Sequence, residues 1–167
     1  DYTYQAAVAQ METMHPFGAW IGVWRGAPQF LSHDTWMEFV WPDTLKLIKA
    51  CVDHDVLPIL HFDSCWDTEL ESLKDLPEKK CILMFDGTTD MRQARKILED
   101  QVCLMGDVPS RMTANDSPEA VYRYVIDLIR DVGPETGLIV STGCDAPLNA
   151  KPENIDAIIQ ATVDYKK

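Results

Sequence analysis

The sequence has little positive charge and no long hydrophobic run, and each shortage argues against a class of function. Its 27 acidic residues outnumber its 15 basic residues, which gives a net charge of −12. Proteins that bind nucleic acid present clustered Lys and Arg, and no basic stripe occurs in this chain. No apolar run approaches the roughly 20 residues that a membrane span needs. We therefore expect no nucleic-acid partner and no membrane-embedded segment.

Cysteine is present, but its pattern is not that of a disulfide framework. The chain has five cysteines, an odd number, and they are widely spaced and mostly inside apolar runs: Cys51, Cys65, Cys81, Cys103 and Cys144. Disulfide-rich domains instead carry an even number of cysteines in a short chain. We expect reduced thiols in a cytoplasmic protein, most of them serving as small core residues.

Short apolar runs alternate with helical patterns along the whole chain. Its length of 167 residues, with 46% hydrophobic and 25% charged residues, is typical of one globular domain with its own core. Five runs have the length and composition of strands: Trp20–Trp24, Leu57–His61, Cys81–Phe85, Val102–Met105 and Leu138–Val140. Strands that alternate with helices predict an α/β fold with a parallel sheet covered by helices.

The helical segments are recognised by their caps and apolar stripes. They are expected at Tyr2–Met14, Ser32–His54 with a break near Pro42, Thr68–Lys74, Asp90–Glu99, Ser117–Gly133 and from Pro152 onward. A long loop is expected between Met105 and Ser117. In the last helix we expect one buried stripe: Ile155, Ile158, Ile159 and Val163. The tryptophans at positions 20, 24, 36 and 41 are interpreted as core or lid packing.

Two of the expected strands end with residues that can hold a metal ion. One leads into His61-Phe62-Asp63, and the last leads into Gly143-Cys144. Imidazole, carboxylate and thiolate are the donors that zinc accepts, and catalytic zinc keeps one position open. Because parallel strands place their carboxyl ends at one edge of a sheet, these three side chains can converge. The sequence therefore predicts a zinc site formed by His61, Asp63 and Cys144, with Cys65 as an alternative ligand.

The same residues also fit ordinary structural roles. A histidine at a strand end is often a satisfied structural residue, Asp63 can cap a helix, and Cys144 can be a small residue in a turn. Asp86 and Asp107 also follow strands and are predicted to contact the substrate, although a helix cap or a turn would explain such positions as well. Asp145 can orient a metal ligand or be solvated.

Taken in order, several segments resemble the uroporphyrinogen decarboxylase superfamily, from about Trp20 to the C-terminus. The matching segments are Phe30-Leu31-Ser32, Glu38–Pro42, Leu57–His61, Leu104–Pro109, Ser141–Pro147 and Lys151–Asn154. The resemblance implies a TIM (β/α)8 barrel, of which this chain covers about strands four to eight. A complete barrel typically takes ~250 residues. We therefore expect residues 1–167 to be the C-terminal part of one barrel domain, which a missing N-terminal portion or a second chain completes.

Within the superfamily, the chain looks most like the methylcobamide:coenzyme M methyltransferases. Decarboxylases of this superfamily end the last strand with Gly-His and need cationic loops for a porphyrinogen with many carboxylates. Here the last strand ends with Gly143-Cys144, and the strand-end loops offer little positive charge beyond Arg25 and Arg111. The methyltransferases bind zinc through His-x-Cys and a distant Cys. His61 and Cys144 match this pattern, and Asp63 stands where the family has cysteine.

The resemblance therefore implies a zinc-dependent methyltransferase. It would move a methyl group from a methylated corrinoid, carried by a partner protein, to a small-molecule acceptor. Aspartate has the charge of a thiolate but is a harder donor, so the acceptor stays open between a coenzyme M-like thiol and tetrahydrofolate. Two alternatives remain. One is a metal-free carboxy-lyase of the uroporphyrinogen decarboxylase type, and the other is a non-catalytic subunit that binds the corrinoid protein.

Overall fold

The structure, a computed structural model, describes residues 2–133 and 137–165. Within these ranges five strands form one sheet: β1 (Gly18–Gly22), β2 (Leu57–Phe62), β3 (Ile82–Phe85), β4 (Cys103–Val108) and β5 (Leu138–Thr142). The helices are α1 (Tyr2–Met14), α2 (His33–Phe39), α3 (Trp41–Asp53), the 3₁₀ helix η1 (Ser72–Asp75), α4 (Met91–Leu98), α5 (Ser110–Asn115), α6 (Pro118–Val132) and α7 (Pro152–Tyr165).

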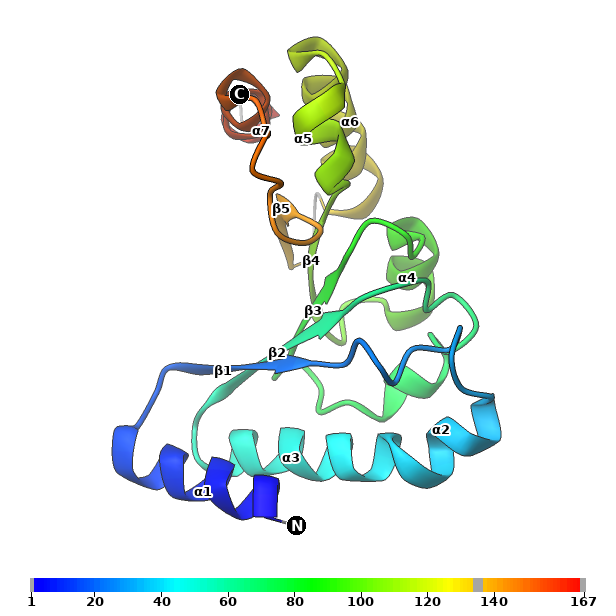
Figure 1. Ribbon diagram of the computed structural model, residues 1–167, viewed down its shortest axis with the longest axis vertical. Helices are drawn as coiled ribbons and strands as arrows, with labels where there is room; N and C mark the ends of the chain where they lie inside the picture. The colour runs from blue at the N-terminus through cyan, green and yellow to red at the C-terminus, as the bar shows by residue number, and fades with distance from the viewer. Residues whose placement is uncertain (1, 134–136, 166–167) are drawn as a thin grey trace.

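All five strands are parallel, and they lie side by side in the order of the chain. Helices α1 to α3 lie along the β1–β2 end of the sheet, and α5 to α7 lie along the β4–β5 end (Figure 1). A sequential parallel sheet with a helical connection after each strand is the arrangement of consecutive units in a (β/α)8 barrel. The predicted fold class, α/β and part of a TIM barrel, is confirmed.

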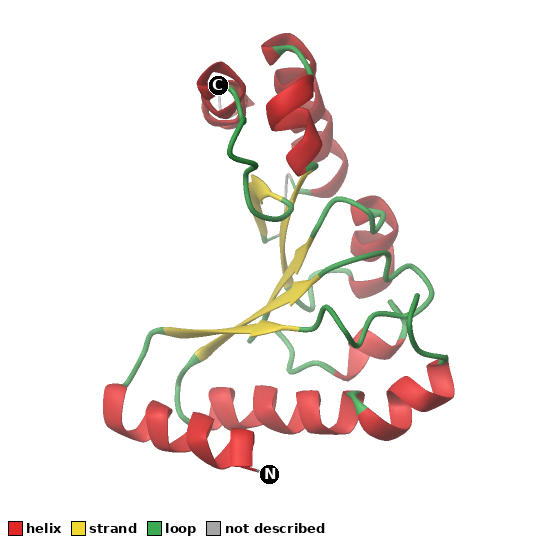
Figure 2. Cartoon of the chain, in the orientation of Figure 1, coloured by secondary structure: helices red, strands yellow, loops and turns green. Residues whose placement is uncertain are grey.

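The strand register gives the sheet two different faces. One row runs across all five strands and packs into or against the main core beneath the helices: Ile21, Leu60, Leu83, Leu104 and Leu138. The next residue along each strand points to the opposite face: Gly22, His61, Met84, Met105 and Ile139. Figure 2 shows the helices gathered along one side of the curved sheet. The second row therefore lies on the face that forms the interior in a TIM barrel.

Helix boundaries largely follow the expected local signals. The predicted break near Pro42 lies at Val40, between α2 and α3, and Trp36 and Trp41 stack across it with ring centroids 4.9 Å apart. Ser117 caps α6 by accepting a hydrogen bond from the Ala120 backbone N–H, and Gly133 ends this helix. Trp36 and Trp41 are both buried in the core, as predicted.

Three predictions about secondary structure are wrong. Residues 106–116 are not one long loop, because β4 continues to Val108 and α5 follows it. Of residues 68–74, only residues 72–74 are helical, as part of the short 3₁₀ helix η1. The stripe predicted for α7 is rotated: Ala157, Ile158 and Ala161 are buried, whereas Ile159 and Val163 are exposed. Alanines on this face let α7 pack closely on α6. Among the described helices, none is long and apolar enough to cross a bilayer.

Candidate metal centre

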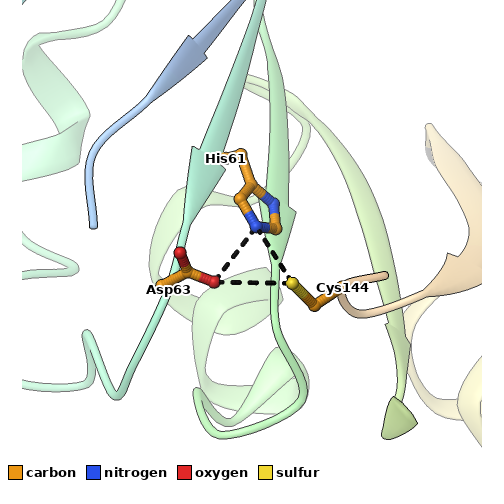
Figure 3. A group of neighbouring side chains, drawn as sticks. All are labelled: His61, Asp63 and Cys144. Atoms are coloured by element: carbon orange, nitrogen blue, oxygen red, sulfur yellow. Dashed lines mark hydrogen bonds and ion pairs between the residues drawn. The ribbon is translucent and has the colours of Figure 1, made fainter. Parts of the chain in front are cut away.

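Three side chains from two distant segments meet at the carboxyl end of the sheet (Figure 3). His61 Nε2 lies 3.1 Å from Asp63 Oδ1 and 3.6 Å from Cys144 Sγ. The Cys144 thiol also lies 3.8 Å from Asp63 Oδ1. In the described ranges, this is the one group of three His, Cys, Asp or Glu residues whose ligand atoms all lie within 4.8 Å of one another. The structure thus brings together the three residues predicted as zinc ligands.

The end of β2 and the turn after it position the first two donors. His61 lies on the inner face of β2 and is 4% exposed. The chain then leaves the sheet, and the indole N–H of Trp66 donates a 2.7 Å hydrogen bond to the Asp63 carbonyl. Trp66 itself is buried in the main core. A core tryptophan therefore fixes the backbone of the residue that supplies the carboxylate.

Burial and charge make the site suited to a cation. Burial raises the pKa of the Cys144 thiol, and the carboxylates of Asp63 and Asp145 raise it further. The backbone N–H of Asp145 lowers this pKa only in part, so a divalent cation between the donors would favour the thiolate. The second ring nitrogen of His61, Nδ1, is buried and has no hydrogen-bond partner among the described residues. The His61 ring therefore contacts polar groups through Nε2. One imidazole, one carboxylate and one thiol form a donor set that fits zinc.

The site opens into a cavity of about 600 Å³ with an aromatic wall. Trp20 stacks on His61 with ring centroids 5.2 Å apart, and Trp24 lies 5.7 Å from Trp20. A side chain at Gly22 would collide with the Trp24 ring, so this glycine leaves room for the ring to fold over β1. Both tryptophans are exposed, by 55% and 46%.

The contact of these two tryptophans with the site is not predicted from the sequence, which favours core or lid packing for them. The available signal was positional. Trp20 lies in register with Ile59 on the inner face, two residues before the position of His61, and a glycine precedes the short segment that carries Trp24. An apolar residue on an inner barrel face can either fill the interior or line a cavity, and the sequence alone does not distinguish the two.

The other predicted site residues lie apart from this group. Cys65 is an exposed residue. Partial desolvation of its thiol and the neighbouring Asp67 carboxylate raise the pKa of that thiol. Asp145 is exposed and lines the cavity. Asp86 makes hydrogen bonds within the loops, and Asp107 is buried and accepts a 2.9 Å hydrogen bond from the Tyr124 hydroxyl of α6. Neither Asp86 nor Asp107 is among the residues that line the cavity.

Comparison with known proteins identifies the family. The sequence model described as "Uroporphyrinogen decarboxylase (URO-D)" matches residues 3–165, nearly the whole chain. The chain belongs to the uroporphyrinogen decarboxylase family. Uroporphyrinogen decarboxylase from Saccharophagus degradans is 30% identical over 142 residues, which cover 83% of this chain and 38% of that protein. The enzyme of the same name from Dichelobacter nodosus is 26% identical over 161 residues, covering 96% of this chain and 43% of that protein.

A solved structure shows the same fold at lower sequence identity. A methyltransferase from Methanosarcina mazei superposes with a TM-score of 0.76 at 16% identity, covering 98% of this chain and 48% of that protein. This member of the uroporphyrinogen decarboxylase family thus spans less than half the length of these relatives. The matched segment covers 38% to 48% of their chains.

Proposed function

We propose that the complete protein is a zinc-dependent methyltransferase with His61, Asp63 and Cys144 as its zinc ligands. The supporting observation is that one nitrogen, one oxygen and one sulfur donor, from the ends of β2 and β5, lie within 4.8 Å of one another. Zinc bound there would lower the pKa of an acceptor thiol and so supply a nucleophile near neutral pH. The methyl donor would be a methylcorrinoid on a partner protein, and the acceptor would be a coenzyme M-like thiol or tetrahydrofolate.

The residues around the site have separate tasks in this proposal. Asp63 and Cys144 together supply two negative charges, which balance a divalent cation, and His61 supplies the neutral donor. Three protein ligands leave the fourth position open toward the cavity, as in catalytic zinc sites. Trp20 holds the His61 ring by stacking, and Trp24 extends this aromatic wall beside the reacting groups.

Decarboxylation is the second candidate, since the curated relatives at 26% and 30% identity are named uroporphyrinogen decarboxylases. A substrate with many carboxylates needs cationic partners. In the described part of the chain, the cavity is lined by Asp63 and Asp145 but by no Lys or Arg. This lining favours methyl transfer over decarboxylation of a polyanion.

Zinc content and methyl transfer test the proposal on the full-length protein. We expect about one zinc ion per chain, lost in His61→Ala and Cys144→Ala but retained in Asp145→Asn, which changes a neighbouring carboxylate of the same cavity. Methyl transfer from methylcobalamin to a thiol, followed through the cobalamin absorbance, should depend on the same two residues. Cys65→Ser should change neither quantity, because that thiol lies outside the ligand group.

Three results would contradict the proposal. A wild-type protein that holds no zinc and takes up none would remove its basis. Carbon dioxide release from uroporphyrinogen that survives Cys144→Ala would favour the decarboxylase. Intact cellular function with Cys144→Ala, together with retained binding of a corrinoid protein, would favour the non-catalytic subunit.

A further inference from the structure

The loop after β3 contacts the segment that carries Asp63. Asp86 Oδ2 accepts a 2.7 Å hydrogen bond from the Ser64 backbone N–H. Its Oδ1 accepts hydrogen bonds from the backbone N–H and the hydroxyl of Thr88, at 2.9 and 2.6 Å. Both carboxylate oxygens are thus engaged by the chain itself. The substrate contact predicted for Asp86 from the sequence stays a prediction.

Ser64, the residue after Asp63, is held from two sides. Its φ of 74° lies in the left-handed region that residues other than glycine rarely adopt. Asp86 accepts its N–H, and the buried Thr89 hydroxyl donates to its carbonyl at 3.2 Å. The Thr89 hydroxyl also accepts the Trp66 backbone N–H at 3.0 Å. Two side chains of the β3–α4 loop therefore fix the backbone next to Asp63.

The same loop contacts the segment that carries Cys144. Gly143 packs directly on the backbone of Asp86 and Gly87, so that a methyl group at position 143 would overlap the Asp86 carbonyl. The Gly143 N–H also donates a 2.9 Å hydrogen bond to the Val108 carbonyl. Residues 86 and 87 thus lie between the segment of Asp63 and the segment of Cys144.

We propose that Asp86 is a positioning residue that sets the separation of Asp63 and Cys144. Strands β2 and β5 are not neighbours in the sheet, because β3 and β4 lie between them. No direct pairing between these two strands therefore fixes the distance between the two ligands. Asp86 performs this task by binding Ser64 through its side chain and supporting Gly143 through its backbone. The inference rests on the proposed metal role of the two ligands.

Zinc affinity of the full-length protein, measured by competition with a chelator, tests the proposal. Outer residues that orient metal ligands typically contribute about 10- to 100-fold to affinity, so Asp86→Ala should weaken zinc binding by that factor. Asp86→Asn keeps one acceptor oxygen and should lose less. Asp90→Ala is the matched control: this carboxylate belongs to the same loop but accepts the N–H groups of Arg92 and Gln93 in α4. Its zinc affinity should equal that of the wild type.

Hydrogen exchange of the zinc-free protein gives a readout that does not depend on the metal. Asp86→Ala should speed exchange in residues 62–66 and in residues 142–146, whereas Asp90→Ala should affect α4 alone. If the wild-type protein binds no zinc, the proposed function fails, and exchange alone decides the positioning role. Unchanged exchange at 142–146, or wild-type zinc affinity in Asp86→Ala, would overturn it. Asp86→Asn supplies both measurements if the alanine variant does not fold.

Discussion

At the scale of single residues, Asp63 is the proposed ligand that departs from the cysteine of the methyltransferases this chain resembles. A thiolate is a softer donor than a carboxylate and suits zinc better. We expect Asp63→Cys to tighten zinc binding by about tenfold, or ~1.4 kcal/mol. Chelator competition measures this change, and Asp145→Cys controls for an extra thiol in the same cavity. Zinc affinity equal to that of the wild type in Asp63→Cys would show that position 63 does not contact the metal.

Asp107 should make stability depend on pH. Burial raises the pKa of its carboxyl above the ordinary value, and the hydrogen bond from Tyr124 opposes this rise only in part. The folded state therefore favours the protonated form. Its contribution to stability is complete below the unfolded-state pKa of about 3.9 and is lost as pH rises through the higher folded-state pKa.

Asp107→Asn removes this titration and keeps an acceptor for the Tyr124 hydroxyl. We expect the variant to gain free energy of unfolding relative to the wild type as pH rises from about 4 toward neutrality. Urea unfolding at a series of pH values measures this gain, which should be on the order of 1 kcal/mol. A difference between the two proteins that stays constant with pH would show that the folded protein does not perturb this carboxyl.

The three donors could be predicted because each lies at the end of an apolar run, where chain order alone fixes its edge of the sheet. The hydrogen-bond partners of Asp86 and Asp107 could not be predicted in the same way. Each follows a strand, but hydrogen bonds to residues 22 and 17 positions away decide what its carboxylate contacts. Such partners depend on tertiary packing, which local sequence patterns do not contain.

At the scale of elements, Asn154 joins α7 to α5. Its side-chain amide is buried and donates to the carbonyls of Met112, Thr113 and Asp116 at the end of α5, at 3.1, 3.0 and 3.1 Å. Asn154→Ala should lower the free energy of unfolding by about 1–3 kcal/mol, because these carbonyls lose their buried donor. Asn149→Ala, at an exposed position, is the control in the same urea titration. Equal midpoints for the two variants would refute this role.

The elements that sequence predicted well are those with strong local signals. Helix α6 has a serine cap, a proline in its first turn and a terminal glycine, and its boundaries match the prediction. Helix α5 was missed because six residues rich in polar side chains carry no helical period. The predicted stripe of α7 is wrong in part because the sequence pattern favours isoleucines over alanines as core residues. Close packing of α7 on α6 selected the smaller residues.

At the scale of the whole molecule, one face of the sheet lies uncovered by the described helices. Trp20 and Ile139 on this face are 55% and 39% exposed. Trp20 is in register with Ile59 on β2, and Ile139 is in register with Met105 on β4. In the complete barrel that we propose, this face would form the interior. The alternation of strands and helices predicted such a sheet, but it did not predict which inner residues line a cavity.

An uncovered apolar face of this kind should drive association of the 167-residue chain when it is produced alone. We expect the chain to bind a dye that reports exposed apolar surface. We also expect self-association with a micromolar Kd, which corresponds to an association free energy of ~8 kcal/mol. Ile139→Lys places a charge on this face and should weaken association. Ile159→Lys, at an exposed position of α7, should leave it unchanged. Sedimentation velocity over a concentration series measures both effects. A monomeric wild-type chain that binds no dye would show that this face is satisfied without further chain, and the proposal of a larger barrel would lose its physical basis.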